Sequence, residues 1–180
     1  MKNPFSIKSM VLVAWLFCAA FTGFAQSALQ APIIETVVLK RPAKDVFAMF
    51  TDSKHLEKWL VRKTNVSAVI WGKFELYWED DMQFNEGCKI LTIEKDRHLS
   101  FEVKGPAEFD ETMNHVHPLT KVTIILNPIG KKQTSITLVH SGWRDSADWV
   151  KARNYFATTW QEAMARLSIY AEKKKSPSLL

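Results

Sequence analysis

His115 and His117 form the one spacing in this sequence that suggests a metal site. A single residue separates them, and alternate residues of an extended segment share a face. Asp110 and Glu111 lie close enough along the chain to add oxygen ligands beside the imidazole nitrogens. The segment offers no third histidine and no cysteine. We therefore expect no metal ion here, and we expect no other cofactor.

His140 is the candidate polar group of a binding site. It has the same strand parity as Ile136 and Leu138, so its ring should point toward the interior. A general base also needs a nearby acid or nucleophile, and the adjacent Ser141 points to the other face. The leading interpretation is a structural, hydrogen-bonded histidine. A polar contact to a ligand is the second interpretation and catalysis the third, so we name no catalytic residue.

Two other reactive groups have simple structural interpretations. Cys88 begins a predicted strand, and no histidine or aspartate is spaced to lower its pKa as a nucleophilic thiol requires. We expect it to be a small buried apolar residue. The carboxylates of Glu79, Asp80 and Asp81 lie together at a turn, where like charges are most simply explained by a solvated hairpin tip.

A long amphipathic helix must position most of the candidate site. It follows the strand-like segment that ends at 139–143, and residues in steps of three and four form one apolar face. Such a stripe needs a broad apolar partner, and the strands before it are the candidate. A long helix across a curved sheet tends to leave a cavity between the layers. The members of the face are Trp149, Ala152, Phe156, Trp160, Ala163, Leu167 and Tyr170.

The preceding sequence predicts an antiparallel sheet with two short helices after its first strand. The first strand is Ile33–Lys40, and Pro42 opens a helix over Ala43–Phe50. Thr51-Asp52-Ser53 offers capping oxygens for a second helix that ends near Trp59 and Leu60. Short turn-like connections exclude parallel crossovers, so the fold class is α+β. The further strands are Thr64–Ile70, Lys73–Trp78, Cys88–Glu94, Leu99–Lys104, Thr120–Asn127 and Ser135–His140.

Alternation within these strands reserves one face for the long helix. In 73–78, for example, Phe74 and Leu76 share the apolar face with Trp78, and Glu75 points to the opposite, polar face. We expect Trp78, Phe101, Val103, Phe156 and Trp160 to wall the cavity. The same side chains have an equally favoured interpretation as ordinary core, because cavities and cores are lined by the same residue types.

The segment Gly105–Pro118 is the longest irregular stretch of the sequence. Structureless segments of this length are commonly lids or binding loops. Its Phe109 and Met113 are apolar and could fold over the mouth of a pocket. We therefore predict that this segment is a lid and that His140 is the polar group beneath it.

The N-terminus has the pattern of a secretory signal peptide. Lys2 and Lys8 precede an apolar run of about 15 residues that ends in a small-x-small cleavage pattern at Ala25. This run is shorter than the roughly 20 residues of a membrane-spanning helix, although an uncleaved anchor remains the alternative. We expect a signal peptide over 1–25, a leader over 26–32, a domain over 33–172 and a frayed basic tail over 173–180.

The charge composition of the sequence indicates which kinds of partner to expect. Loss of residues 1–25 lowers the formal net charge from +5 to +3, and no basic stripe alternates with aromatic residues. We therefore expect no nucleic-acid partner and, after cleavage, no stable membrane insertion. The expected location is periplasmic or secreted. One cysteine remains in the mature chain, so stability must come from the core.

The order and spacing of several short motifs resemble a known superfamily. These motifs are Val46-Phe47, Phe50-Thr51-Asp52, Leu56–Trp59, Gly72–Trp78, Leu99–Val103 and Leu138–Trp143 with the following helix. The chain resembles the SRPBCC (START-like, helix-grip) superfamily, in the branch similar to the C-terminal domain of the activator of the ninety-kilodalton heat-shock chaperone ATPase. That resemblance implies a hydrophobic cavity, with members ranging from lipid or polyketide binders to cyclases and co-chaperone domains.

The favoured function is an exported binding protein for a small apolar or amphipathic molecule held between sheet and helix. An enzyme of the cyclase or dehydratase type would use the same cavity but needs a convergent acid and base. A co-chaperone-like interaction module would use the outer face of the sheet. The export signal argues against a chaperone role, since ATP is not expected outside the cytoplasm.

Overall fold

The computed structural model describes residues 30–78 and 85–173. The predicted signal peptide, most of the leader and most of the basic tail lie outside the described residues, as does the acidic cluster at 79–81. The described elements are β1 (Ile33–Leu39), α1 (Ala43–Thr51), α2 (Ser53–Trp59), β2 (Lys63–Val66), β3 (Phe74–Tyr77), β4 (Ile90–Glu94), β5 (His98–Val103), η1 (Ala107–Phe109), η2 (Asp110–Asn114), β6 (Thr120–Gly130), β7 (Gln133–Ser141) and α3 (Ala147–Lys173).

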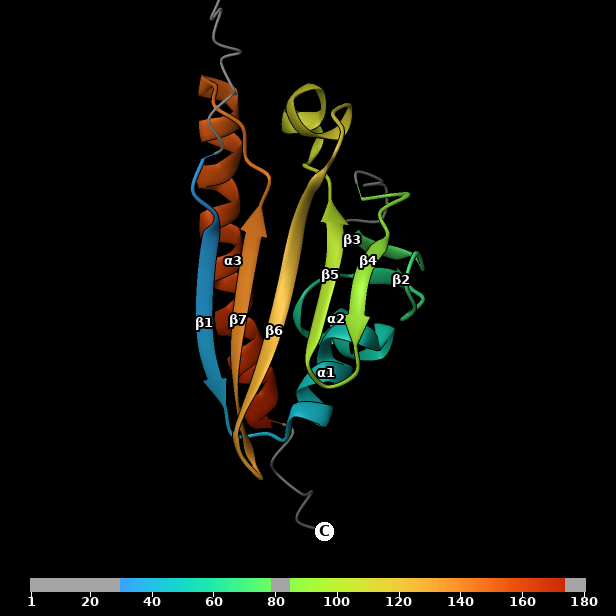
Figure 1. The fold of residues 1–180 in the computed structure, drawn as a ribbon, viewed down its shortest axis with the longest axis vertical. Helices are drawn as coiled ribbons and strands as arrows, with labels where there is room; N and C mark the ends of the chain where they lie inside the picture. Colours follow the sequence, from blue (N-terminus) through green and yellow to red (C-terminus); the bar gives the residue numbers. More distant parts are fainter. Residues whose placement is uncertain (1–29, 79–84, 174–180) are drawn as a thin grey trace, which may run out of the picture.

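A five-stranded antiparallel sheet lies against one long helix. Its strand order is β1-β7-β6-β5-β4, and α3 runs along the β1 and β7 side of the sheet (Figure 1). This arrangement confirms the predicted α+β, helix-grip class. The strands β2 and β3 do not join that sheet but pair with each other, and an isolated bridge links Lys73 to Lys89 at the start of β4. Among the described helices, none has the length and apolar character to cross a membrane.

The two short helices form where the sequence predicts them. Pro42 precedes α1, and Asp52 separates α1 from α2 while its carboxylate accepts a hydrogen bond from the Lys54 amide at 2.8 Å. That bond satisfies one of the amides that a helix leaves unpaired at its start. Both helices bury their apolar faces, with Phe50 and Leu56 among the residues least exposed.

The predicted strand 64–70 is four residues too long at its end. The strand β2 stops at Val66, because residues 67–72 close a tight loop in which the Gly72 amide donates to the Val69 carbonyl at 2.9 Å. Trp71 has a φ of 62°, which is uncommon for a bulky residue. A Cβ on Gly72 would lie 2.1 Å from the Ser67 carbonyl oxygen, so this position requires glycine. Local apolar runs do not reveal such backbone constraints.

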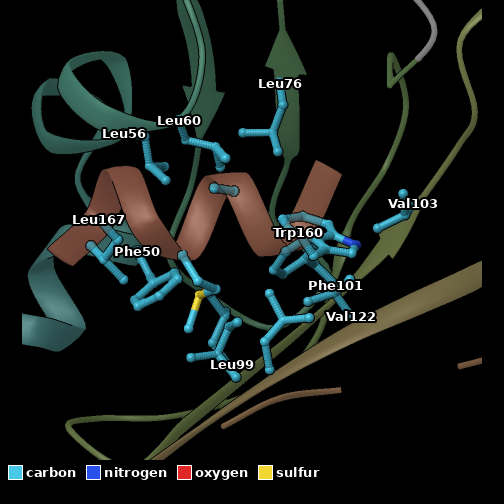
Figure 2. Packing of buried hydrophobic residues seen from close by; sticks show 14 of the residues in the cluster. Phe50, Leu56, Leu60, Leu76, Leu99, Phe101, Val103, Val122, Trp160 and Leu167 are labelled. Atoms are coloured by element: carbon cyan, nitrogen blue, oxygen red, sulfur yellow. The ribbon is translucent and has the colours of Figure 1, made fainter. Parts of the chain in front are cut away.

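The core lies between the inner face of the sheet, the two short helices and α3. The apolar stripe of α3 is buried as predicted, except that Tyr170 is half-buried. Figure 2 shows Trp160 and Leu167 of this stripe among the buried side chains. On β6, Val122, Ile124 and Leu126 point inward while Ile125 is exposed on the outer face. The predicted alternation is therefore confirmed for the strands under the helix.

Candidate functional site

A single row of side chains crosses the inner face of the sheet beneath α3. Cross-strand pairing places Phe101 of β5 opposite Val122 of β6, and Val122 opposite His140 of β7. Ile90 and Ile33 extend the row to the two edge strands. Each side chain in this row is at most 4% exposed. His140 is therefore a polar ring in an otherwise apolar row, pointing inward as its strand parity predicted.

Aromatic side chains surround the His140 ring. Its ring centroid lies 4.3 Å from that of Trp143 and 5.0 Å from that of Phe156. The Trp160 indole Nε1 donates a hydrogen bond to His140 Nδ1 at 2.9 Å, and the Trp143 Nε1 donates to the His140 carbonyl oxygen at 2.9 Å. Among the described residues, His140 Nε2 has no hydrogen-bond partner, although the ring is fully buried.

Burial keeps this histidine neutral. Removal from water lowers the pKa of His140 to about 3, and no charged side chain contributes to that shift. A general acid or base near neutral pH needs a pKa close to the working pH. His140 therefore offers a neutral hydrogen-bonding ring at physiological pH.

The predicted wall residues surround the same region. Phe101 is 2% exposed and stacks on Phe74 with 3.9 Å between ring centroids. Val103 ends β5 and belongs to the same buried apolar cluster as Trp160 of α3. Trp78, by contrast, is only half-buried and packs at the periphery of the core. The structure thus brings Phe101, Val103 and Trp160 together, whereas Trp78 lies at the edge of the predicted wall.

The predicted lid is helical rather than structureless. Residues 107–114 form a short 3₁₀ turn followed by a π-helical turn. The side chain of Asn114 closes the base of the lid, since its Oδ1 accepts from the Gly105 amide at 2.7 Å and its Nδ2 donates to the Gly105 carbonyl at 3.0 Å. Met113 is fully buried, and Phe109 contacts Tyr155 of α3 with 5.4 Å between ring centroids. The lid therefore lies closed on α3 beside Phe156.

A hollow of about 320 Å³ lies at a different place. It is formed where the end of β1 meets the end of α3, with Leu39, Arg41, Ser168 and Ala171 among its lining residues. None of its lining residues belongs to the predicted site. The region around His140 is instead packed by side chains that are almost fully buried. A molecule beside His140 would therefore need these side chains to move apart.

The comparisons with known proteins decide the family. Residues 40–172 match the family model described as "Activator of Hsp90 ATPase homolog 1-like protein". The chain belongs to this family. A search of curated protein sequences finds no match. The predicted resemblance to the activator branch is thereby confirmed.

Several solved structures share the fold of this chain at low sequence identity. The Aha1 dimer from Colwellia psychrerythraea is 17% identical with a TM-score of 0.62, over 82% of this chain and 100% of that one. An Hsp90 activator from Plasmodium falciparum is 17% identical with a TM-score of 0.61, over 78% and 95% of the chains. DynU16, from the dynemicin biosynthetic locus, is 18% identical with a TM-score of 0.61, over 81% and 49%.

The candidate metal ligands that lie together in the structure are not the set that the sequence suggested. One ligand atom each from Asp110, Glu111 and His115 lies within 4.8 Å of the others, and His117 is not part of the group. His115 Nε2 is 2.8 Å from Asp110 Oδ2. Hydrogen bonds from Asn114 and then His115 lower the pKa of Asp110. The π-helical turn, rather than an extended strand, brings His115 back toward the acids.

Two further titratable groups are buried in the β2 and β3 region. Cys88 is fully buried, and burial raises the pKa of its thiol to about 12, which confirms the small-apolar interpretation. The prediction for Glu75 was wrong, because it is 3% exposed. Burial raises its pKa, but hydrogen bonds from the Gly87 amide at 3.2 Å and from Asn65 at 2.7 Å outweigh that effect and leave the pKa lowered. The turn that covers Glu75 lies outside its strand, so alternation could not reveal it.

Proposed function

We propose that this protein binds a small apolar or amphipathic molecule between the five-stranded sheet and α3, with residues 107–114 as the lid. The observation that carries the proposal is the fully buried His140 ring, which lies among aromatic side chains and has one nitrogen without a partner in the described part of the chain. Buried polar groups in proteins are almost always paired, and each exception calls for an explanation. A bound molecule that pairs with this nitrogen would explain the exception.

The construction of the lid supports this proposal. It is joined to β5 through Gly105, and a Cβ at that position would lie 2.8 Å from the Met113 sulfur and 3.0 Å from the Phe109 Cβ. The two apolar lid residues thus pack directly over this hinge. The bonds of Asn114 to Gly105 close the base of this segment locally, and residues 107–114 belong to neither described sheet, so opening of the lid would break no pairing between strands. Ligand sites are commonly placed beneath segments of this kind.

The enzyme alternative lacks a second group. A cyclase or dehydratase needs an acid and a base converging on the substrate. His140 is the titratable group in this region, and the only cause of its lowered pKa is burial. Glu75 is buried in a separate cluster around Asn65 and Gly87. The described residues therefore favour binding over proton-transfer chemistry.

The interaction-module alternative rests on the outer face of the sheet. Ile34 and Val38 of β1 and Ile125 of β6 are 59%, 49% and 45% exposed. Their strand register places all three on the face away from α3. A partner protein on this surface would leave the inner residues as ordinary core. One solved structure with the same fold is an Hsp90 activator, which supports this alternative, although its sequence identity to this chain is low.

A fluorescent apolar probe tests the choice between the two faces. An environment-sensitive naphthalene fluorophore should bind the purified protein at one site per chain. Val103→Trp places a larger side chain on the inner face beneath α3 and should abolish binding, whereas the control Ile125→Trp adds the same side chain to the outer face and should leave binding unchanged. Circular dichroism checks that both variants fold.

The lid variant Phe109→Ala provides a second test that adds no large side chain to the core. It should speed dissociation of the probe, because it removes a ring that covers the site beside Tyr155. Absence of probe binding to the unmodified protein would contradict the proposal. Binding that is lost in Ile125→Trp and kept in Val103→Trp would favour the interaction module instead.

We also propose that the protein acts outside the cytoplasm. The apolar run before Ala25 and its small-x-small end support cleavage at that point. N-terminal sequencing of protein recovered from the periplasmic or extracellular fraction should begin near Gln26. Full-length protein found in the membrane fraction would contradict cleavage and support the anchor alternative.

A further inference from the structure

The hydrogen bond between Trp160 and His140 fixes which nitrogen of the imidazole carries its proton. An indole Nε1 can only donate, so His140 Nδ1, 2.9 Å away, must accept. A neutral imidazole has one donor nitrogen and one acceptor nitrogen. The proton of the neutral ring is therefore on Nε2, and the unpartnered atom is a donor.

The described residues around His140 offer that donor no oxygen. The row neighbours of His140 on the adjoining strands are Ile33 and Val122, which are apolar. Trp143 and Phe156 cover the ring, and the one polar side-chain atom of Trp143 already donates to the His140 carbonyl. Aromatic faces accept hydrogen bonds only weakly. The missing partner is thus an acceptor from outside the described chain.

The required acceptor is uncharged. His140 is fully buried among apolar side chains, and no charged group contributes to its environment. Placing a carboxylate there would bury an unpaired negative charge, which is far more costly than burying a neutral oxygen. Ammonium ions and other groups that only donate hydrogen bonds cannot pair with the Nε2 proton.

We propose that the ligand is an uncharged, largely apolar molecule with a carbonyl-type oxygen, and that this oxygen accepts a hydrogen bond from His140 Nε2. The inference rests on the proposed function, since it requires a ligand between the sheet and α3. It adds the chemical class of that ligand and assigns His140 as the residue that selects it. The aromatic rings of Trp143 and Phe156 bind the apolar body of the molecule.

Two fluorophores that differ only in this oxygen test the proposal. One is a dimethylaminonaphthalene with a propionyl group, and the other carries a propyl group of similar size in its place. The unmodified protein should bind the propionyl probe about tenfold more tightly, because its oxygen pairs a buried donor that the propyl probe leaves unpaired. His140→Phe should reduce the affinity ratio to about one.

His140→Gln is the matched control for the loss of probe preference in His140→Phe. Its side-chain oxygen can accept from Trp160 while its amide nitrogen donates, so a preference for the propionyl probe should persist in part. Equal affinities of the two probes for the unmodified protein would overturn the proposal and leave the proposed function standing. A preference that survives in His140→Phe would also overturn it. Failure of both probes to bind would overturn the proposed function and this inference together.

Nuclear magnetic resonance of the unmodified protein keeps the proposal testable if the variants do not fold. The ring nitrogens of His140 should show a protonated Nε2 and an unprotonated Nδ1 at pH 7. Addition of the propionyl probe should move the Nε2 proton resonance downfield, and the propyl probe should not. An unprotonated Nε2, or identical responses to both probes, would contradict the assignment of this donor.

Discussion

The buried polar side chains that pack against the two halves of α3 differ in how completely they are hydrogen-bonded. The C-terminal half packs on α2, where the Trp59 indole donates to the Met49 carbonyl at 2.9 Å and the Tyr170 hydroxyl lies 2.6 Å from His55 Nδ1. The N-terminal half packs on His140, whose Nε2 has no partner in the described residues. Both halves are rich in aromatic and apolar side chains, and both bury them.

This difference separates a permanent core from a site. A fully paired cluster is stable without any addition, whereas an unpaired buried donor costs about 1–3 kcal/mol. We propose that the unpaired His140 donor destabilises the ligand-free protein by this amount, and that a hydrogen bond to a ligand oxygen removes the cost. Residues 107–114 pack on this half and contact Tyr155, while the other half packs on α2.

The largest expected effect comes from removing the ring that both bonds to His140 and packs on the sheet. Trp160 is 3% exposed, so Trp160→Ala should lower the free energy of unfolding by about 3–5 kcal/mol. Denaturant unfolding measures this. Ile169→Ala on the exposed side of α3 is the control and should change stability by less than about 0.5 kcal/mol. An unchanged midpoint in Trp160→Ala would show that this face is not core.

Acid should destabilise the protein through His140. The pKa of this ring is about 3 in the folded protein, against an ordinary value of 6.5, so between these values the unfolded chain binds a proton that the folded chain excludes. The stabilisation is complete above pH 6.5 and is lost as the pH falls toward 3. From pH 7 to pH 5 the loss should be about 2 kcal/mol, given about 1.4 kcal/mol for each pH unit.

The variant His140→Phe isolates that contribution. Its free energy of unfolding should fall less than that of the unmodified protein over the same range, by about 2 kcal/mol, because other titrating groups are common to both. Denaturant titrations at pH 7 and pH 5 provide the comparison. Equal pH dependence in the two proteins would show that His140 is not buried as a neutral ring.

A smaller effect is expected at the base of the lid. Asn114→Ala removes the two bonds to Gly105 and one to Asp110, and it should lower stability by about 1–2 kcal/mol. It should also raise the association rate of an apolar probe, because the lid opens more often. Asn154→Ala, at an exposed position on α3, is the control. An unchanged association rate would show that this segment does not limit entry.

The sequence predicted the fold better than the site. Strand parity placed His140 inward, and the spacing from Trp149 to Leu167 identified the buried face of α3 correctly. Both follow from local periodicity, which a sequence displays directly. The same periodicity failed at Glu75, because the turn at 85–87 covers it from outside the strand.

The pairing of His140 could not be read from the sequence. Its bond to Trp160 joins residues twenty positions apart and depends on how α3 is rotated over β7. The separation of β2 and β3 from the main sheet depends on the tight loop at 67–72, including the positive φ of Trp71. Such features follow from the packing of whole elements, and no short pattern encodes them.

The indole protons of three tryptophans test the central claim most directly. In a titration with the propionyl probe followed by proton–nitrogen correlation spectra, the Nε1 signals of Trp160 and Trp143 should shift, because both indoles contact the His140 ring. The Nε1 signal of Trp59, paired with the Met49 carbonyl under the other half of α3, should stay in place. A shift of Trp59 with no change in Trp160 and Trp143 would contradict a ligand site beneath the lid.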